Sequence, residues 1–523
     1  MSLCENYMTY VSIVFETSNV TTIDSRYLLK LTQDKIPIMF SKQFLSKHSL
    51  LKFVGASALV IISSCATGNE IVQNKPEEPK NGSSDVSYWL TESSSMSYLK
   101  KQTKALNFTA TSNVNPSITV DSLTKYQTMD GFGFAMTGGS AFLINKLGAT
   151  DKANLMKELF SNDSTAIGIS YLRVSLGASD LSSSVFSYDD IDPSGVDNDL
   201  QHFSLKPDSA DLIPVLKSAL AINPNIKIMA SPWSAPAWMK TNKSAKGGSL
   251  KPEFFGVYAR YFVKYIQAMK AQGIPIDAIT IQNEPLNPDN NPSMYMTALD
   301  QALFIKNHLG PEFAKNNITT KIILYDHNCD MYSYPLTVLN DPDARKYSDG
   351  SAFHLYGGNI IALTTVHNAY PEKSVYFTEQ WVGAPSNFVE DLKWHVKNLI
   401  IGAPRNWSKN VIEWNLASDP NYYPHTDGGC GTCLGALTIS NSVSRNVAYY
   451  IIGHASKFVP AGSVRIESSV VSNLPNVAFV TPTGKKVLIV LNESNASQTF
   501  NIQFKNKIVS PVLGAGAVAT YVW

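Results

Sequence analysis

The stretch Ile279-Thr280-Ile281-Gln282-Asn283-Glu284-Pro285 has the pattern of a buried β-strand that ends in polar side chains. Its β-branched residues favour a strand that is covered on both faces, and Pro285 would stop that strand. In a barrel of parallel strands, the residues at the carboxyl end of each strand face the active site. We therefore interpret Glu284 as a catalytic proton donor. The alternative is a strand-capping carboxylate that only pairs with a surface lysine.

A second carboxylate follows a similar apolar run, because Glu379 ends the stretch Val375-Tyr376-Phe377-Thr378-Glu379. Two such groups at the ends of different strands can face each other across a sugar. Glycoside hydrolysis with retention needs them about 5–5.5 Å apart, so that one protonates the leaving oxygen while the other attacks the anomeric carbon; inversion needs a wider gap. In this chemistry Glu284 would be the acid/base and would hold its proton near neutral pH, whereas Glu379 would be the ionised nucleophile.

Short apolar runs alternate with amphipathic segments between residues 126 and 445. In one segment, large apolar residues recur at three- and four-residue spacing, which marks the buried face of a helix rather than a sugar platform. Strand–helix units in series predict an α/β fold, a (β/α)8 TIM barrel over residues 126–445. The helical stripe consists of Phe254, Tyr258, Tyr261, Phe262, Tyr265 and Met269. The expected strands end at Phe134, Val174, Ser231, Asn283, Asp326, Tyr356, Glu379 and Asn415.

A series of motifs occurs in an order that resembles glycoside hydrolase family 30, which includes lysosomal glucosylceramidase and microbial β-1,6-glucanases. The resemblance extends from the start of the expected barrel to the C-terminus. It implies a retaining β-glycosidase that acts on a β-linked glycan, with no cofactor and no metal. The motifs are Met129-Asp130-Gly131-Phe132-Gly133, Ser231-Pro232-Trp233-Ser234-Ala235-Pro236-Ala237-Trp238-Met239-Lys240, Gln282-Asn283-Glu284-Pro285, Phe353-His354-Leu355-Tyr356, Thr378-Glu379, Glu413-Trp414-Asn415-Leu416-Ala417 and Gly453-His454-Ala455-Ser456-Lys457-Phe458-Val459-Pro460.

Polar side chains at the expected strand ends would complete the site. Asn283 has amide donors that can bond a sugar 2-hydroxyl, a contact that strengthens as an oxocarbenium-like state forms. Arg173 cannot lose its proton, so beside Glu379 it would keep the nucleophile ionised; an ordinary ion pair of the barrel is the alternative. Tyr356 and His354 could orient the same carboxylate. A lone histidine is more often a satisfied core residue, and only the family motif raises His354 to a site residue.

The composition argues against nucleic acid or anionic lipid as a partner, because 43 basic residues balance 42 acidic ones. We expect a neutral partner, namely a β-linked glycan. The chain has 24 tyrosines and eight tryptophans, whose rings can stack on the apolar faces of sugars. Trp414 and Trp233 lie near expected strand ends and offer such faces. For Trp233, packing at the barrel mouth is the alternative.

Two cysteines lie in the glycine-rich run Pro424-His425-Thr426-Asp427-Gly428-Gly429-Cys430-Gly431-Thr432-Cys433. This run is compatible with a zinc loop, a redox pair or a loop staple. Zinc sites usually need a second ligand pair, and redox pairs usually open a helix in a thioredoxin-like unit. We favour a small disulfide between Cys430 and Cys433 in a loop that overhangs the barrel mouth. In this interpretation His425 and Asp427 bond glycan hydroxyls.

One departure from the resembled family bears on specificity. Lysosomal glucosylceramidase has an aspartate just after its Gly-Phe-Gly-x-Ala-Met-Thr segment, where it holds outer hydroxyls of the terminal glucose; here Gly138-Gly139 follow Thr137. We therefore expect β-1,6-glucan as the substrate ahead of glucosylceramide, with β-xylosides or other β-glycosides third. A function of another class is an inactive surface lipoprotein that only captures a glycan. The presence of both glutamates argues against that function.

The N-terminal residues have the pattern of an export signal that does not start at residue 1. Basic residues between Met39 and Lys52 precede the apolar run 53–62, and small residues then precede Cys65. We expect translation to begin at Met39, which makes residues 1–38 a doubtful extension. We further expect a lipoprotein signal at 39–65 whose Cys65 is lipidated, and a flexible tether at 66–90. The protein would be exported and held at a bacterial membrane only through this lipid anchor. A buried apolar segment in a genuine extension is the alternative.

Residues 446–523 contain short apolar runs separated by turn-forming residues, which predict an antiparallel β-sandwich. In the resembled family, the segment before the barrel adds strands to this sandwich. We therefore expect residues 91–125 to contribute to it, so that the companion domain is discontinuous in sequence.

Overall fold

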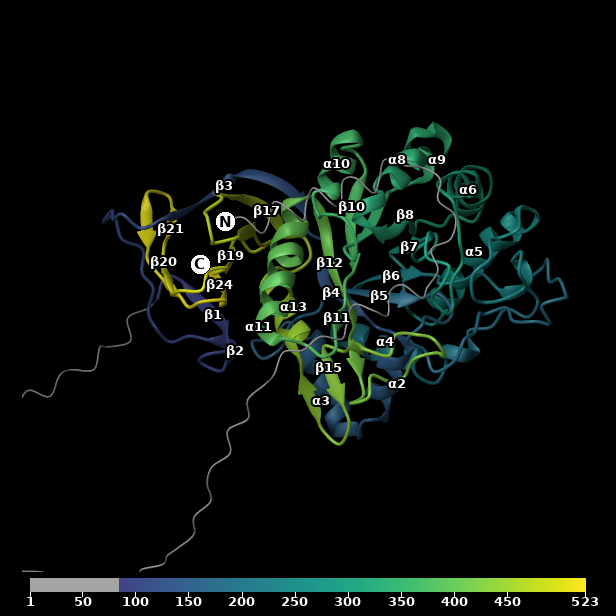
Figure 1. Cartoon of the computed structure of the whole chain (residues 1–523), viewed down its shortest axis with the longest axis horizontal. Helices are drawn as coiled ribbons and strands as arrows, with labels where there is room; N and C mark the ends of the chain where they lie inside the picture. Colours follow the sequence, from purple (N-terminus) through teal and green to yellow (C-terminus); the bar gives the residue numbers. More distant parts are fainter. Residues whose placement is uncertain (1–83) are drawn as a thin grey trace, which may run out of the picture. The chain divides into compact units, whose positions relative to one another are not determined.

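The computed structural model describes residues 84–523, which comprise a closed barrel and a separate β-sheet domain (Figure 1). The expected extension at 1–38, the signal at 39–65 with Cys65, and the first part of the expected tether lie outside the described residues. The tether ends before residue 90, because Ser87–Glu92 forms strand β1 and pairs with β24 (Val518–Val522). Apolar side chains explain this difference, since the Trp89 ring packs against Phe458. Within the described part, no helix combines the length and apolar character needed to cross a bilayer.

Parallel strands close the barrel in the order β10-β12-β4-β5-β6-β7-β8-β9, which confirms the predicted TIM barrel. Two strands end earlier than expected, because β7 stops at Thr280 and β9 stops at His354. Beyond Thr280 the backbone leaves the ladder, and the amide of Asn283 donates to the carbonyl of Pro232 at 2.8 Å. The barrel strands are β4 (Gly131–Ala135), β5 (Tyr171–Ser175), β6 (Lys227–Ser231), β7 (Ala278–Thr280), β8 (Lys321–Asn328), β9 (Gly350–His354), β10 (Ser374–Glu379) and β12 (Ser408–Asn415).

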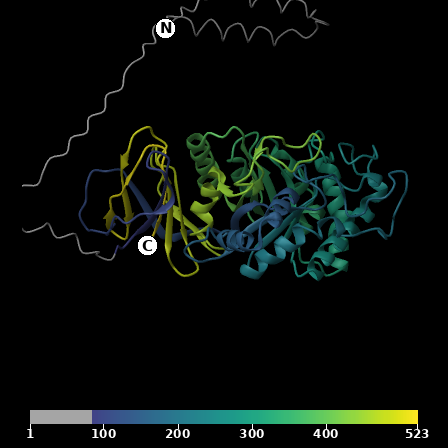
Figure 2. The same ribbon diagram turned by 90° about the horizontal axis from the view of Figure 1, so that it is seen from below.

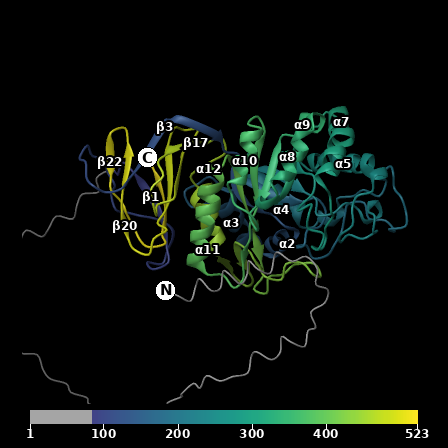
Figure 3. The same ribbon diagram turned by 45° about the horizontal axis from the view of Figure 1, so that its top comes forward.

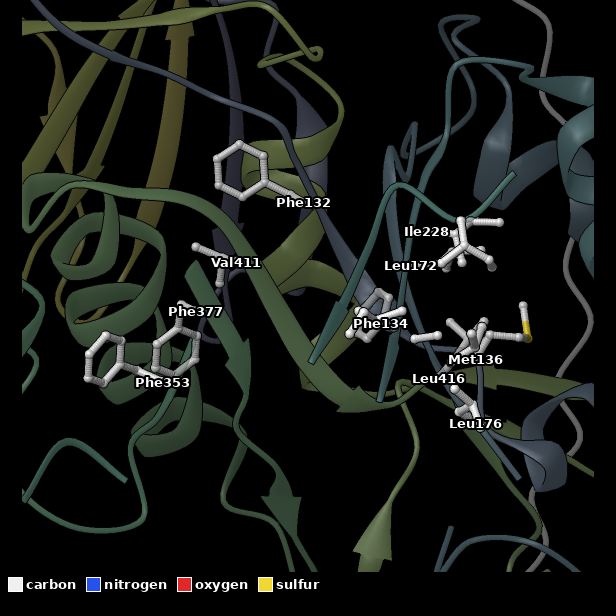
Figure 4. Close-up of a cluster of buried hydrophobic side chains, with 14 of the residues drawn as sticks. Phe132, Phe134, Met136, Leu172, Leu176, Ile228, Phe353, Phe377, Val411 and Leu416 are labelled. Atoms are coloured by element: carbon white, nitrogen blue, oxygen red, sulfur yellow. The ribbon is translucent and has the colours of Figure 1, made fainter. Parts of the chain in front are cut away.

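Helices connect consecutive barrel strands and cover their outward face. The helix α5 (Phe255–Ala271) buries the aromatic stripe that the sequence predicted, and Tyr258, Tyr261 and Tyr265 are fully covered. The outward-facing side chains of the strands supply the other half of the core between strands and helices. Figure 4 shows two of them, Phe353 of β9 and Phe377 of β10. The other helices are α2 (Gly138–Lys146), α3 (Ala149–Phe160), α4 (Leu212–Ile222), α6 (Ala298–Phe304), α7 (Gly310–Lys315), α8 (Ser333–Asn340), α9 (Pro342–Tyr347), α10 (Ala362–Ala369), α11 (Phe388–His395), α12 (Ala403–Arg405) and α13 (Val447–Ser456), with π-helical turns η4 (Ile305–Leu309) and η6 (Val396–Gly402).

The second domain contains a nine-stranded sheet in the order β2-β1-β24-β19-β18-β17-β3-β21-β22, so N-terminal strands lie among C-terminal ones (Figure 2). Its strand β19 buries both faces. Leu488 and Val490 belong to the core of the sheet domain, whereas Val487, Ile489 and Leu491 belong to the core that includes the barrel. Burial on both faces explains the unbroken apolar run of β19. The strands of this domain are β2 (Ser97–Lys101), β3 (Ser117–Thr128), β17 (Val464–Ser468), β18 (Asn476–Val480), β19 (Lys486–Leu491), β21 (Asn501–Phe504) and β22 (Lys507–Val509), with β1, β24 and the separate pair β20 (Gln498–Thr499) and β23 (Val512–Leu513).

The junction of the two domains lies later in the chain than the expected boundary at residue 446. Helix α13 follows that boundary and packs against β4 and α11, so the first sheet strand after it is β17. His454 of α13 joins two sheet strands, because its ring nitrogens lie 2.9 Å from Thr520 Oγ1 and 2.8 Å from Thr91 Oγ1. The helical run from α11 to α12, both labelled in Figure 3, also contacts this sheet, because the intervening η6 packs on β18 and β19.

Candidate active site

The side chains that point into the barrel form an apolar layer followed by a polar layer. Along a β-strand, every second side chain points to the same face of the sheet. In most strands, the side chain two positions after the apolar layer is buried but polar or aromatic. A polar layer therefore lies at the carboxyl end of the barrel. The apolar layer consists of Tyr171, Met229, Ala278, Ile323, Ala352, Tyr376 and Ile412. The polar layer includes Arg173, Ser231, Thr280, His354, Thr378 and Trp414.

Strand β8 reaches the polar layer through a β-bulge. Its pairing with β9 shifts register between Tyr325 and His327, and Tyr325 and Asp326 both have positive φ angles, of 72° and 69°. The extra residue turns Asp326 into the barrel, where regular alternation would have placed Tyr325. The Asp326 carboxylate accepts hydrogen bonds from Thr280 Oγ1 at 2.7 Å and Thr378 Oγ1 at 2.6 Å. Asp326 was expected at a strand end but not in the site, because strand periodicity does not reveal a bulge.

Arg173 connects the groups at the floor of the site. Its guanidinium is fully buried and donates to Glu379 Oε2 at 2.5 Å and to Asp326 Oδ2 at 2.8 Å. It also donates to Asn283 Oδ1 at 2.6 Å, so the carbonyl end of that side-chain amide is already occupied. Burial raises the pKa of Asp326, but the Arg173 charge and the His354 hydrogen bond outweigh it and lower that pKa strongly. The structure therefore gives Arg173 both an ion pair of the barrel and a contact with the expected nucleophile.

Glu284 and Glu379 face each other, and an oxygen of one carboxylate lies within 4.8 Å of an oxygen of the other. Glu284 follows the end of β7 and has a φ angle of 45°, in the left-handed region that strains residues other than glycine. Contacts of both its backbone and its side chain hold it in place. Its backbone amide donates to the carbonyl of Asp326 at 3.0 Å, and the side-chain amide of Asn287 donates to its Oε2 at 2.7 Å.

His354 lies between the carboxylates and is closer to Glu284 than to Glu379, the carboxylate that it was expected to orient. Its Nδ1 is 3.1 Å from Glu284 Oε1 and 3.8 Å from Glu379 Oε1, and its Nε2 is 3.2 Å from Asp326 Oδ1. The hydroxyl of Tyr356 donates to Glu379 Oε1 at 3.0 Å. The nucleophile candidate therefore has fixed partners at both of its oxygens, Arg173 at Oε2 and Tyr356 at Oε1.

The charges of the free site differ from the expectation that Glu284 holds the proton. Burial lowers the pKa of His354, but the charge of Glu379 and the hydrogen bonds with Asp326 and Glu284 raise it to about 9. Burial raises the pKa of Glu284, but the hydrogen bond and charge of His354 lower it to about 2. Burial raises the pKa of Glu379 above its ordinary value, against the charges of His354 and Arg173. At neutral pH the shared proton of the free site therefore lies on the His354 side of its hydrogen bond with Glu284.

A pocket of about 630 Å³ opens onto the two glutamates. That volume is typical of sites for small ligands. Trp233 and Trp414 line it, but their rings stack on each other with centroids 5.3 Å apart and are only 2% and 4% exposed. The Arg173 guanidinium lies 4.8 Å from the Trp233 ring centroid. Both tryptophans therefore act mainly as packed walls, and only small parts of their rings can touch a sugar.

Asp180 is a pocket residue that the sequence analysis missed. It is 6% exposed and lines the pocket, and its Oδ1 has no hydrogen-bond partner among residues 84–523. Burial and the charges of Glu379 and Glu284 raise the pKa of Asp180 to about 7. The free Oδ1 of this carboxyl group can accept a hydrogen bond from a ligand in the pocket, which Gly138 has no side chain to do. Asp180 lies in an irregular segment after β5, where no periodicity singles it out.

The loop 424–433 forms one wall of the pocket, although not with the side chains that the sequence analysis selected. Cys430 and Cys433 are joined by a disulfide, and both line the pocket together with Gly428 and Gly429. The strand β14 (Cys433–Leu434) pairs with β11 (Val382–Gly383), which follows the nucleophile candidate in the chain. The disulfide ring is thus attached to the segment that leaves β10.

His425 and Asp427 have other contacts, and both lie outside the set of described residues that line the pocket. The His425 ring stacks on Tyr423 with centroids 4.1 Å apart. The carbonyl of Asp427 accepts from the Asn291 side chain at 2.9 Å. Between them, the Thr426 amide donates to the carbonyl of Asp180 at 2.8 Å. These hydrogen bonds hold the backbone of the loop against the pocket, and the His425 and Asp427 side chains lie outside the pocket lining.

Glu284, His354 and Glu379 have one ligand atom each within 4.8 Å, a spacing that could also hold a metal ion. A metal would need the lone pair of His354 Nδ1. The pKa of about 9 for His354 means that the ring carries protons on both nitrogens at neutral pH. At neutral pH a metal ion would have to displace the proton that His354 Nδ1 shares with Glu284.

Comparison with known proteins places this geometry in a family. The chain matches the models of the glycosyl hydrolase family 30 TIM-barrel domain over residues 129–459 and of the family 30 beta sandwich domain over residues 462–521. It is 35% identical over 394 residues to an endo-1,6-β-D-glucanase of Aspergillus fumigatus, covering 70% of this chain and 78% of that protein. It is 29% identical over 435 residues to the lysosomal acid glucosylceramidase of Mus musculus, covering 76% and 82% respectively.

A solved structure supports the same assignment. An endo-β1,6-glucanase superimposes with a TM-score of 0.77 and 36% sequence identity, over 84% of this chain and 99% of that chain. Because the family models span both domains and relatives align over most of their length, the chain belongs to glycosyl hydrolase family 30 and is a glycoside hydrolase.

Proposed function

We propose that the protein is an endo-acting β-1,6-glucanase that works with retention of configuration. The observation that carries the mechanism is the spacing of Glu284 and Glu379, whose carboxylate oxygens approach within 4.8 Å. Retaining glycosidases hold their carboxyl groups about 5–5.5 Å apart, whereas inverting ones leave about 6.5–9.5 Å for a water molecule. The spacing therefore supports direct attack by one carboxylate on the sugar.

In the first step, Glu379 attacks the anomeric carbon while the bond to the leaving oxygen breaks and Glu284 gives that oxygen a proton. The sugar is then held as an ester of Glu379. In the second step, Glu284 removes a proton from water, whose oxygen attacks the anomeric carbon and releases Glu379. Arg173 and Tyr356 donate to the two oxygens of Glu379, which holds the attacking oxygen in position. Two inversions restore the original configuration.

The proton for the leaving oxygen reaches Glu284 from His354 in this mechanism. The two side chains share a hydrogen bond of 3.1 Å between His354 Nδ1 and Glu284 Oε1. The charge of Glu379 is a main reason why the pKa of His354 is raised to about 9. When Glu379 forms the ester it loses that charge, and His354 becomes a stronger acid. Proton release is thereby coupled to attack by the nucleophile.

The substrate assignment draws on the wall around Glu284. The pocket lining that follows Glu284 in the chain contains the polar Asn287, Asp289 and Asn290 as well as the apolar Leu286 and Pro288, and Asn328 adds another polar group. Polar groups suit a leaving group with hydroxyls better than the hydrocarbon chains of a ceramide. Four relatives named endo-1,6-β-glucanases are 32% to 36% identical to this chain, whereas five relatives named glucosylceramidases are 27% to 31% identical.

A substrate panel tests the proposal. Purified protein is given β-1,6-glucan, an aryl β-glucoside, glucosylceramide and xylan, and the early product of the glucoside is followed by proton NMR. We expect cleavage of the β-1,6-glucan and initial release of the β-anomer, and loss of both in Glu379→Gln. An initial α-anomer would refute the retaining mechanism, preferred cleavage of glucosylceramide would replace the substrate, and glycan binding without hydrolysis would support the inactive lipoprotein.

We also propose that Cys65 is lipidated and that the enzyme is exported and anchored to a bacterial membrane. The support is the order of basic, apolar and small residues before Cys65 in the sequence. Labelling with a radioactive fatty acid in a bacterial host tests this, with Cys65→Ser as the control. Equal labelling of both proteins, or none of either, would contradict the proposal.

A further inference from the structure

His327 lies in the wall of the active-site pocket without a hydrogen bond that would explain its position. It is 9% exposed and lines the pocket, and its Nδ1 is buried with no partner in the part of the chain that the structure describes. Burial lowers the pKa of His327, so the ring is neutral near pH 7 and has one donor and one acceptor nitrogen. Buried polar groups nearly always have partners, so an exception in a pocket wall points to a ligand.

The backbone of β8 is distorted in a way that brings His327 to this wall. A regular strand points successive side chains to opposite faces. The bulge between Tyr325 and His327 allows Asp326 to contact Arg173 while the next two residues, His327 and Asn328, both line the pocket. Strained backbone of this kind is concentrated at functional sites. The distortion thus serves two purposes, the floor of the site and the wall beside it.

His327 lies on the acid/base side of the site. Its ring centroid is 6.3 Å from that of His354, which contacts Glu284. After burial, the charge of Glu284 has the largest effect on the pKa of His327. In the retaining mechanism the nucleophile lies below the sugar that becomes bound, whereas the acid lies beside the oxygen of the sugar that leaves. Groups around Glu284 therefore face the leaving sugar.

We propose that His327 binds a hydroxyl of the sugar on the leaving side of the scissile bond and selects for a glycan in that position. A sugar hydroxyl both donates and accepts hydrogen bonds, so it can pair with either nitrogen of a neutral imidazole. Asn287 lines the same pocket and donates to Glu284 Oε2 at 2.7 Å, so groups of one pocket position both the leaving sugar and the acid. The inference rests on the proposed function, because it assumes that the leaving group is a sugar.

Two substrates that differ only on the leaving side test the inference. We compare kcat/KM for a 4-nitrophenyl β-glucoside, whose leaving group has no sugar hydroxyl, with kcat/KM for a β-1,6-linked gluco-oligosaccharide. In His327→Ala we expect the oligosaccharide value to fall about tenfold more than the aryl glucoside value, as for one lost hydrogen bond in the transition state. His327→Gln should recover part of this loss. The control is His202→Ala, because His202 pairs with Asp197 outside the pocket and its side chain is 65% exposed.

The outcomes separate the inference from the function on which it rests. If the unmodified enzyme cleaves both substrates and His327→Ala lowers both values equally, or neither, His327 does not bind the leaving sugar. If the unmodified enzyme cleaves the aryl glucoside but no β-1,6-linked oligosaccharide, the proposed function fails and the inference fails with it. Should His327→Ala not fold, His327→Phe keeps the ring volume without the nitrogens and gives the same comparison.

Discussion

Replacing His354 by glutamine should move the alkaline side of the pH–activity profile. His354 lies 3.1 Å from Glu284 and lowers the pKa of that carboxyl group from 4.5 to about 2, while its own pKa is raised to about 9. The lowering for Glu284 corresponds to ~3 kcal/mol in favour of the ionised carboxylate. In the unmodified enzyme the proton needed by the leaving oxygen is therefore lost only as pH rises through the pKa of the His354 and Glu284 pair, near 9.

Glutamine keeps a hydrogen-bonding side chain but has no charge. In His354→Gln the proton must lie on Glu284 itself, whose pKa then rises because burial is no longer opposed by a neighbouring cation. The alkaline limb of kcat/KM, which reports the free enzyme, should move to lower pH by about 1 unit or more. The assay is kcat/KM for an aryl β-glucoside between mildly acidic and alkaline pH.

His202→Gln is the control, because it removes an imidazole that pairs with Asp197 outside the pocket and should leave the position of the alkaline limb unchanged. Thermal denaturation of both variants establishes that they are folded. An alkaline limb at the same pH in His354→Gln and in the unmodified enzyme would refute the reasoning, because the proton would then not be held by His354.

Three further predictions concern stability and the pocket wall. Burial lowers the pKa of His454 to about 3, so below pH 6.5 the unfolded chain binds a proton at this residue and the folded chain does not. The contribution of neutral His454 to stability is therefore complete above pH 6.5, and urea titrations should show a loss of ~3 kcal/mol by pH 4 that is absent in His454→Gln. Asp326→Asn leaves the buried Arg173 with one carboxylate instead of two and should lower the free energy of unfolding by about 3 kcal/mol, with a lower kcat; unchanged denaturation would contradict the ion pair. Replacing Cys430 and Cys433 by serine should cost at most ~2 kcal/mol of stability and raise KM for β-1,6-glucan more than it lowers kcat, whereas an unchanged KM would show that the loop does not touch the glycan.

Local patterns in the sequence were sufficient to predict the barrel and the two glutamates. Each barrel strand is a short apolar run between helical segments, and β-strand and helix periods are properties of neighbouring residues. Glu379 ends its strand as predicted, and Glu284 follows a strand that is shorter than expected. The sheet domain was also predictable, because strands such as β19 are recognisable from their own residues. Each of these segments buries an apolar face, and its own residues reveal that face whichever segments it packs against.

The tertiary structure alone decided how the site is assembled. The approach of Glu284 and Glu379 to within 4.8 Å depends on β7 and β10, two strands that β8 and β9 separate in the barrel. The place of the shared proton depends on His354 lying between three carboxylates, and the entry of Asp326 into the site depends on a bulge against β9. The loop 424–433 faces the pocket with its disulfide and glycines rather than with His425 and Asp427. Electrostatic interactions and hydrogen bonds depend on the distance and burial of groups far apart in the chain, and only the folded arrangement of the strands sets those quantities.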